Sequence, residues 1–333
     1  MSGAVNVVAS VSGGKDSAAM ALHMRERGIE ATHVFCDTGW EHPATYEYIR
    51  GPLTDAIGPV VWLRSEVTLP DEREQLAQHY EARLGHYSAM IRWILSKGMF
   101  PSRQRRFCTE QLKVLPTAEY LQPMTEAAPG WVVNAVGIRA GESFARSQLP
   151  EWERSNLGIP AVTWRPLREW TEADVIAIHK RHGLAPNPLY LQGASRVGCW
   201  PCIYARKAEI LMLAKLTPVH VEVIADLERE MTRLSLQRVA ERQQAPIPEG
   251  LDEDTREIAV QLRDPTHWRN QRTYFGVGDK GRNWDSYNIR RTVEWAQTDR
   301  GGHQLPMFSP LDTAAQDGCM RWGMCEVAES EEA

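Results

Sequence analysis

The residue types best suited to chemistry stand together at positions 12–17, which read Ser-Gly-Gly-Lys-Asp-Ser. An apolar, β-rich segment over 4–11 precedes them, and a helical pattern over 18–27 follows. Small residues between a strand and a helix leave backbone N–H groups free to surround a phosphate, and the helix N-terminus adds positive potential. The lysine would supply a cation, and the two serines would supply hydroxyl donors. The segment therefore predicts a phosphate-binding loop; the structural alternative is a glycine-rich turn.

The loop differs in spacing from the Walker A loop and from the G-x-G-x-x-G dinucleotide fingerprint. It resembles the SGGxDS loop of N-type ATP pyrophosphatases, which cleave ATP between the α and β phosphates. The resemblance implies that ATP and Mg²⁺ bind here, with Asp16 positioning Mg²⁺ and with Lys15 and Asp16 as catalytic residues. The loop residues predicted to bind the nucleotide are Ser12, Gly13, Gly14, Lys15, Asp16 and Ser17.

Further blocks resemble the phosphoadenosine phosphosulfate reductase family, and the resemblance spans roughly residues 5 to 205. Residues 34–43 read VFCDTGWEHP, and residues 137–146 read GIRAGESFAR. Residues 166–202 then contain PLREWTEADV, NPLY and SRVGCWPC in the order typical of the family. The resemblance implies an adenosine contact and two contacts to phosphates or a second substrate, made respectively by Asp37 and by Arg139 and Arg146.

Two departures from the reductase pattern bear on the choice between branches of this family. Sulfonucleotide reductases generally have a degenerate loop, whereas this loop matches the ATP-splitting version. The reductases also use a cysteine in a Glu-Cys-Gly-x-His context, whereas this chain has Cys319 and Cys325 in other contexts. Both departures favour the ATP pyrophosphatase branch, which includes a component of DNA phosphorothioation systems and phage-encoded relatives.

Four cysteines are the predicted metal ligands. Cys199 and Cys202 form a C-x-x-C turn, and Cys108 matches the first member of the Cys-Cys pair in iron–sulfur reductases of the family, whose second member is replaced here by threonine. The resemblance implies a 4Fe-4S iron–sulfur cluster with a fourth ligand from the C-terminal segment, for which Cys325 is favoured over Cys319. A four-cysteine zinc site, a redox dithiol and plain core cysteines are the alternatives.

Strands that alternate with helices predict an α/β fold with a parallel twisted sheet flanked by helices. The resemblance adds that this sheet is of the adenine nucleotide α-hydrolase, or HUP, type. A helical stretch over 71–98 is expected to cover the sheet, and Thr171 is expected to cap a helix that ends before Gly183. The predicted strands lie over 4–11, 32–36, 59–63, 131–138 and 162–166.

The alternation stops after Cys202. One long helix is predicted over 219–243, with a proline-containing linker over 244–250. We therefore predict a nucleotide-binding domain over 1–205 and a helical, loop-rich C-terminal extension with an acidic tail over 206–333.

Two arginine-rich segments are weaker candidates for binding nucleic acid. Arg103, Arg105 and Arg106 could contact phosphates, and a solvated basic face is the equally weighted alternative. Aromatic and arginine residues between 267 and 295 could stack on bases, although packing aromatics with surface arginines is the commoner outcome. This second set includes Trp268, Arg269, Arg272, Arg282 and Trp284.

Composition limits the classes of protein and partner. Apolar residues make up 43% and charged residues 24%, which is ordinary for a soluble globular protein, and no apolar run approaches a membrane span. The formal charge of −5 gives no general attraction to nucleic acid or anionic lipid. The first residues read as a strand rather than a signal peptide, and six cysteines are too few for a disulfide scaffold, so a cytoplasmic location is expected.

These observations favour an enzyme that cleaves ATP to AMP and pyrophosphate and activates an unknown acceptor, such as a nucleic acid, for sulfur transfer. The expected partners are ATP, the acceptor, a sulfur donor protein such as a cysteine desulfurase, and a second copy in a homodimer; no membrane partner is expected. One alternative is a sulfonucleotide reductase that uses thioredoxin. The other is a non-catalytic module that senses nucleotides or binds nucleic acid.

Overall fold

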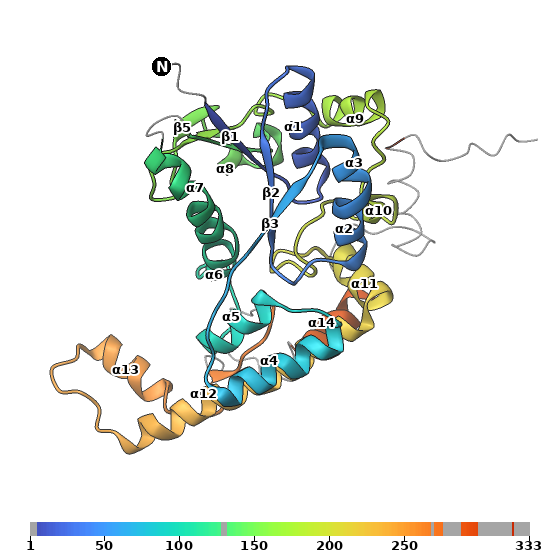
Figure 1. Cartoon of the computed structure of the whole chain (residues 1–333). Helices are drawn as coiled ribbons and strands as arrows, with labels where there is room; N and C mark the ends of the chain where they lie inside the picture. The colour runs from blue at the N-terminus through green and yellow to red at the C-terminus, as the bar shows by residue number, and fades with distance from the viewer. Residues whose placement is uncertain (1–4, 128–131, 268–269, 276–287, 299–321, 323–333) are drawn as a thin grey trace, which may run out of the picture. The chain divides into compact units, whose positions relative to one another are not determined.

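The computed structural model describes residues 5–127, 132–267, 270–275, 288–298 and 322 (Figure 1). These residues group into two compact units, and each unit is assembled from separate stretches of the chain. The first unit contains the described residues of 1–65 and 109–200 together with Trp322. The second contains 66–108 and the described residues of 201–304.

A six-stranded sheet forms the centre of the first unit, in the order β3-β2-β1-β4-β6-β5. All neighbouring strands are parallel except β5 and β6, which pair antiparallel. The predicted parallel α/β fold is therefore confirmed, and the short edge strand β5 was not predicted. The strands are β1 (Asn6–Ser10), β2 (Thr32–Asp37), β3 (Val60–Arg64), β4 (Val132–Val136), β5 (Trp152–Arg154) and β6 (Val162–Trp164).

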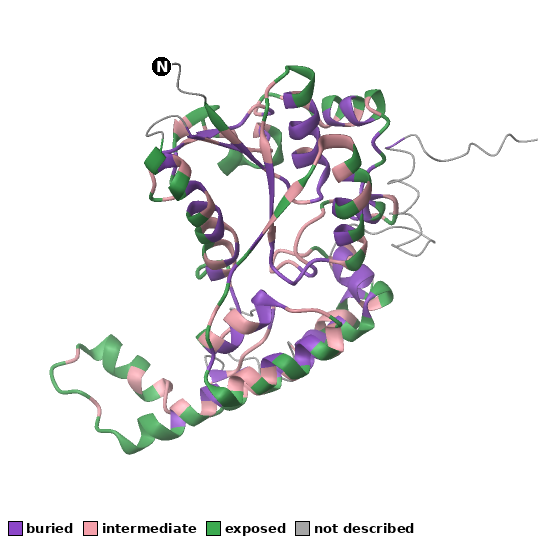
Figure 2. Cartoon of the chain, in the orientation of Figure 1, coloured by how far each residue is buried: buried purple, intermediate pink, exposed green. Residues whose placement is uncertain are grey.

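Apolar side chains pack on both faces of this sheet. Ala9 and Ala135 belong to a core cluster with residues of α1 (Lys15–Glu26) and α9 (Glu172–Arg181). The adjacent Val8 packs instead with Leu121 of α7 (Leu115–Ala127). Neighbouring residues of one strand thus point to opposite layers, as expected for a parallel sheet covered by helices on both faces. Figure 2 shows the buried residues along α1.

Helix ends in this unit follow the local sequence signals. Helix α1 is followed by Gly28 at a φ of +64°, a left-handed conformation that glycine adopts without strain. Thr171 accepts the N–H of Asp174 and so caps α9 as predicted. The remaining helical elements of the unit are α2 (Pro43–Tyr48), α3 (Thr54–Ile57), α8 (Phe144–Ser147), α10 (Pro188–Leu191), π-helical turns at Ile49–Leu53 and Glu110–Val114, and a 3-10 turn at Ala140–Glu142.

The second unit is helical. Its centre is α12 (Pro218–Gln244), which matches the long helix predicted over 219–243 and is buried at Val223, Leu227 and Met231. The stretch predicted as helical over 71–98 forms two helices, because Gly85 adopts a φ of +79° and ends the first. The other helices are α4 (Asp71–Leu84), α5 (Ala89–Lys97), α11 (Lys207–Leu216), α13 (Glu253–Gln261) and α14 (Ile289–Ala296), and the short α6 (Phe107–Thr109) contains residues of both units.

Helices α4 and α5 group with α12 rather than with the sheet that they were expected to cover. Arg83 of α4 forms an ion pair with Asp226 of α12, and Arg92 of α5 pairs with Glu74 and Glu81 of α4. The compact units therefore divide the chain differently from the predicted ranges 1–205 and 206–333. No helix among the described residues has both the length and the apolar character needed to cross a bilayer.

Candidate nucleotide site

The loop between β1 and α1 is shaped by one glycine and tied together by serine hydroxyls. Gly13 has a φ of +70°, and a Cβ at this position would lie 2.8 Å from Cγ2 of Thr45. Both observations require glycine. The Ser17 hydroxyl donates to the Gly14 carbonyl at 3.0 Å and accepts the N–H of Ser12 at 3.0 Å. The two ends of the loop are thereby joined.

Several backbone N–H groups of the loop are left for a ligand. Ala18 is the first residue of α1 whose N–H bonds back along the chain, to the Gly14 carbonyl at 3.2 Å. N–H groups that lack an acceptor at a helix N-terminus form a ready anion site, strengthened by the helix dipole. Within the part of the chain that the structure describes, the N–H groups without a protein acceptor are those of Gly13, Gly14, Asp16 and Ser17.

Lys15 carries the positive charge of the loop and is only 7% exposed. Its Nζ lies 3.5 Å from Oε1 of Glu172 and 3.6 Å from Oδ2 of Asp16. It also lies 5.1 Å from the ring centroid of Tyr190, within cation–π distance. The ammonium is therefore held by two carboxylates and an aromatic face beside the free N–H groups.

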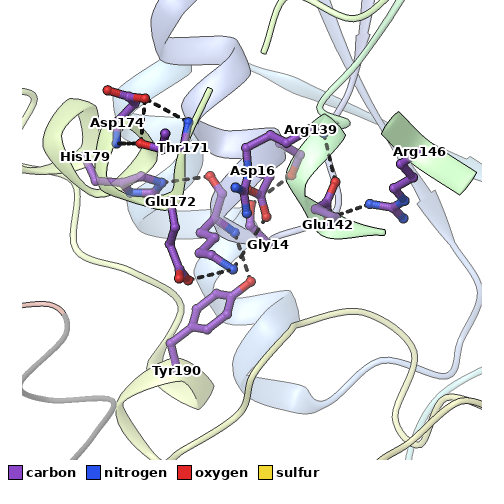
Figure 3. Close-up of polar contacts among 12 residues, drawn as sticks. Gly14, Asp16, Arg139, Glu142, Arg146, Thr171, Glu172, Asp174, His179 and Tyr190 are labelled. Atoms are coloured by element: carbon purple, nitrogen blue, oxygen red, sulfur yellow. Dashed lines mark hydrogen bonds and ion pairs between the residues drawn. The ribbon is translucent and has the colours of Figure 1, made fainter. Parts of the chain in front are cut away.

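Residues of α9 and α10 hold the backbone of the loop, although sequence analysis assigned them no role. His179 Nε2 donates to the Lys15 carbonyl at 2.9 Å, and the Tyr190 hydroxyl accepts the Lys15 N–H at 3.1 Å (Figure 3). His179 Nδ1 also lies 3.3 Å from the Leu184 carbonyl, and burial lowers the pKa of the imidazole. Asn187 donates to the Gly13 carbonyl at 3.2 Å. Asn187 and Tyr190 belong to the NPLY motif, which marked this segment as similar to the family but did not indicate that these side chains support the loop.

Arg139 reaches the loop from the end of β4, the strand beside β1. Its Nε lies 2.5 Å from Oδ1 of Asp16, and it is only 8% exposed. Strand order reverses between β1 and β4, the position where open α/β sheets usually bind ligands. Figure 3 shows Glu142 between Arg139 and Arg146, accepting the Arg139 N–H at 2.9 Å and pairing with the Arg146 guanidinium. The structure therefore brings the loop, Arg139 and Arg146 into one connected polar network.

Asp37 lies at the end of β2, and protein groups occupy both of its carboxylate oxygens. Oδ1 accepts the N–H of Gly39 at 2.9 Å and the Tyr46 hydroxyl at 3.1 Å, and Oδ2 lies 2.6 Å from Arg64. The same Tyr46 hydroxyl lies 2.8 Å from Glu41, a carboxyl whose pKa burial raises. Asp37 thus organises this edge of the sheet, and its predicted adenosine contact stays a prediction.

One residue near the C-terminus packs against the loop supports. Trp322 is 2% exposed, and its ring centroid lies 5.2 Å from that of His179 and 6.1 Å from that of Tyr190. His179 and Tyr190 hydrogen-bond to the backbone of Lys15. Trp322 therefore packs against the side chains that support the loop, without contacting the loop through these rings itself. No sequence motif marks Trp322 as functional.

The predicted cysteine ligands are not gathered into a metal site by the described residues. Cys108, Cys199 and Cys202 are partly exposed, and Cys199 belongs to the first unit whereas the other two belong to the second. Among the residues that the structure describes, no group of three or more His, Cys, Asp or Glu side chains could hold a metal ion. Cys319 and Cys325 lie outside the described residues. The described thiols do not fit a cluster by themselves, so the iron–sulfur and zinc assignments stay predictions.

The architecture defines an α/β protein with a phosphate-type loop at the switch point of a parallel sheet. The chain belongs to the phosphoadenosine phosphosulfate reductase domain family, whose model matches residues 6–205. The resemblance deduced from the sequence is thereby confirmed at the level of the family.

Two relatives and one solved structure show the range of similar proteins. An uncharacterized 37.8 kDa protein of Escherichia phage 186 is 31% identical over 97% of each chain. An adenosine 5′-phosphosulfate reductase of Allochromatium vinosum is 31% identical over 40% of this chain and 52% of its own length. The phosphoadenylyl-sulfate reductase of Candida auris is similar with a TM-score of 0.42 and 19% identity, covering 59% of this chain and 82% of that chain.

Proposed function

We propose that the protein is an ATP pyrophosphatase-type enzyme that splits ATP into AMP and pyrophosphate to activate an acceptor. The observation that carries this proposal is the set of unpaired N–H groups in residues 12–17, with Lys15 beside them. A loop of this kind surrounds phosphate oxygens, and Arg139 adds a second cation from the neighbouring strand.

The reaction would begin with attack of an acceptor oxygen on the α phosphorus of ATP. A bond forms between that oxygen and phosphorus, the bond from phosphorus to the bridging oxygen breaks, and pyrophosphate leaves with the electron pair. The N–H groups and Lys15 would stabilise the charge that accumulates on the separating phosphates, which is the usual dominant contribution in phosphoryl-type transfer. Glu172 and Tyr190 keep the Lys15 ammonium in place for this role.

Asp16 fits the predicted magnesium role in one respect. Arg139 contacts Oδ1 and the Lys15 ammonium lies 3.6 Å from Oδ2, so Mg²⁺ would share Oδ2 with Lys15. Mg²⁺ commonly binds proteins through one or two carboxylates, with substrate phosphates and water completing its shell. When bound with ATP it would neutralise phosphate charge.

The acceptor chemistry rests on the family resemblance. A sulfur nucleophile from a donor protein such as a cysteine desulfurase would displace AMP from the adenylated acceptor, and a nucleic acid is the acceptor class that we favour. No step is assigned to a metal cluster. A thioredoxin-dependent sulfonucleotide reductase is the second candidate, because one relative carries the name adenosine 5′-phosphosulfate reductase.

The test is product analysis with protein purified without oxygen. AMP and pyrophosphate should form from ATP, and Lys15→Met should reduce the rate about 10²–10³-fold, as loss of one charge-stabilising donor usually does. Asp16→Asn should abolish turnover. Lys180→Met is the matched control, because Lys180 is exposed in the last turn of α9.

Unchanged pyrophosphate release by Asp16→Asn would contradict the assignment. Formation of sulfite from a sulfonucleotide with thioredoxin, without ATP cleavage, would show that the protein is a sulfonucleotide reductase instead. Tight ATP binding without any product would instead indicate a sensing module.

A further inference from the structure

Four arginines of the second unit form a cluster that the proposed nucleotide chemistry does not use. Arg105 follows α5, Arg238 and Arg242 lie one turn apart on α12, and Arg272 lies in the described segment 270–275. Burial, together with the charges of the other three arginines, lowers the pKa of Arg272. The guanidinium group of Arg272 therefore lies near enough to the other three to be repelled by them.

Gly98, which follows α5, allows the guanidinium group of Arg238 to lie close to the backbone. A Cβ at this position would overlap the guanidinium group of Arg238. The arginine side chain therefore lies directly on the backbone of the turn that leads into residues 99–106. Glycine at this turn permits the approach, and Arg105, which follows the turn, lies near Arg272 as Arg238 does.

The cluster lacks the carboxylates that other arginines of the same unit have. On α12, Arg229 pairs with Asp226, and Arg233 lies 2.6 Å from Glu230. Among the described residues no carboxylate lies within ion-pair distance of the four clustered arginines, which are Arg105, Arg238, Arg242 and Arg272.

One polar atom of the cluster is left without any partner. Nε of Arg272 is buried and has no hydrogen-bond acceptor within the described chain. An unpaired, desolvated cation surrounded by like charges destabilises the free protein. A bound polyanion would relieve the repulsion on Arg272.

The surroundings favour a nucleic acid over other polyanions. Arg103 and Arg106 lie 5.4 and 5.5 Å from the ring of Tyr204, so a partly exposed aromatic ring and planar guanidinium groups border the cluster through the same loop as Arg105. Rings and guanidinium planes of this kind stack on bases. A membrane surface would need exposed apolar side chains beside the charges. Among the described residues of 98–106, 238–242 and 270–275, no large apolar side chain is exposed.

We propose that the arginine cluster binds the sugar–phosphate backbone of a nucleic acid, with Tyr204 positioned to stack on a base. The proposal identifies nucleic acid as the class of acceptor for the proposed adenylation. It rests on the proposed function only for the chemistry that follows binding. Binding itself needs no ATP, so its failure and the failure of ATP cleavage are separate results.

The experiment compares two double variants of the full-length protein that remove the same charge from the same helix. Arg238→Gln with Arg242→Gln removes two clustered arginines, whereas Arg229→Gln with Arg233→Gln removes two arginines paired to carboxylates at the same spacing. Fluorescence anisotropy would measure affinity for a labelled single-stranded DNA and for its duplex, without ATP, over a series of salt concentrations. We expect the cluster variant to bind more weakly and to lose about 2 from the slope of log K against log salt concentration, about 1 for each phosphate contact. The control variant should retain the wild-type slope.

Equal losses in the two double variants would overturn the proposal, because they would show a general charge effect. Absence of DNA binding by the wild-type protein would overturn it as well, and so would binding to anionic phosphatidylserine vesicles instead of DNA. Arg272→Gln provides an independent readout. It should weaken DNA binding while leaving the denaturation midpoint equal to or above that of the wild type, whereas a purely structural arginine would lower the midpoint.

Discussion

Replacing Gly137 by alanine tests whether the close approach of the β4 end to the loop determines nucleotide binding. A Cβ at position 137 would lie 2.8 Å from the Cα of Ser17 and 2.9 Å from the carbonyl oxygen of Asp16. Both are backbone atoms at the start of α1, so no side-chain rotation relieves the overlap. Overpacking of this kind typically costs about 1–3 kcal/mol. If the added Cβ displaces the loop from its phosphate-binding conformation, this cost appears as weaker nucleotide binding, and affinity should decrease roughly 5- to 150-fold.

Isothermal titration with ATP and Mg²⁺ would measure the affinity, and urea denaturation would measure the free energy of unfolding. Gly141→Ala is the matched control, because a Cβ at position 141 meets nothing within 4 Å although the residue follows the same strand. The control should bind ATP as the wild type does. Wild-type affinity in Gly137→Ala would refute the reasoning, since the alanine would then fit without displacing the loop.

Two further predictions concern buried polar groups. Tyr190→Phe removes the acceptor of the Lys15 N–H, and leaving that buried donor unpaired should lower the free energy of unfolding by about 1–3 kcal/mol in urea denaturation; an unchanged value would show that the hydroxyl is dispensable. Burial raises the pKa of Glu228 from 4.5 to about 7, so the folded protein binds more protons than the unfolded chain between these values and stability should fall as pH rises through them. Comparing urea denaturation at pH 5 and pH 7.5 should show this fall, of at most about 3 kcal/mol, in the wild type but not in Glu228→Gln; equal pH dependence in both would assign the effect to other groups.

The parts of the fold that could be predicted are those that depend on neighbouring residues in the chain. The strand–loop–helix at residues 6–26, the cap at Thr171 and the long helix α12 all follow from local patterns, and the structure contains each of them. Edge strand β5 has only three residues and no apolar run, so no periodicity marked it. The grouping of α4 and α5 with α12 depends on ion pairs between residues more than a hundred positions apart, such as Arg83 and Asp226, which no local pattern reveals.

The residues of the candidate site also divide into those that local sequence predicts and those that depend on distant contacts. Residues 12–17 were identified because the loop is continuous in sequence. His179 and Tyr190 were not assigned a role, because their function depends on contacts to Lys15 across more than 160 residues. Asp37 was assigned to adenosine by resemblance, whereas the structure shows its carboxylate held by Tyr46 and Arg64. Resemblance assigns a role to a position such as Asp37 as a prediction, and the three-dimensional contacts show which protein groups each side chain touches.

The ion pairs around the loop also determine how a nucleotide would reach it. The six ionic side chains of this network carry three positive and three negative formal charges, on Lys15, Arg139, Arg146, Asp16, Glu142 and Glu172. Their fields largely cancel at a distance, so they provide little electrostatic steering of an approaching anion. The nucleotide would instead be captured at short range, after its negative charge has been offset by a divalent cation in solution. Its association rate should therefore depend little on ionic strength, in contrast to that of any polyanion attracted by the unpaired arginines of the second unit.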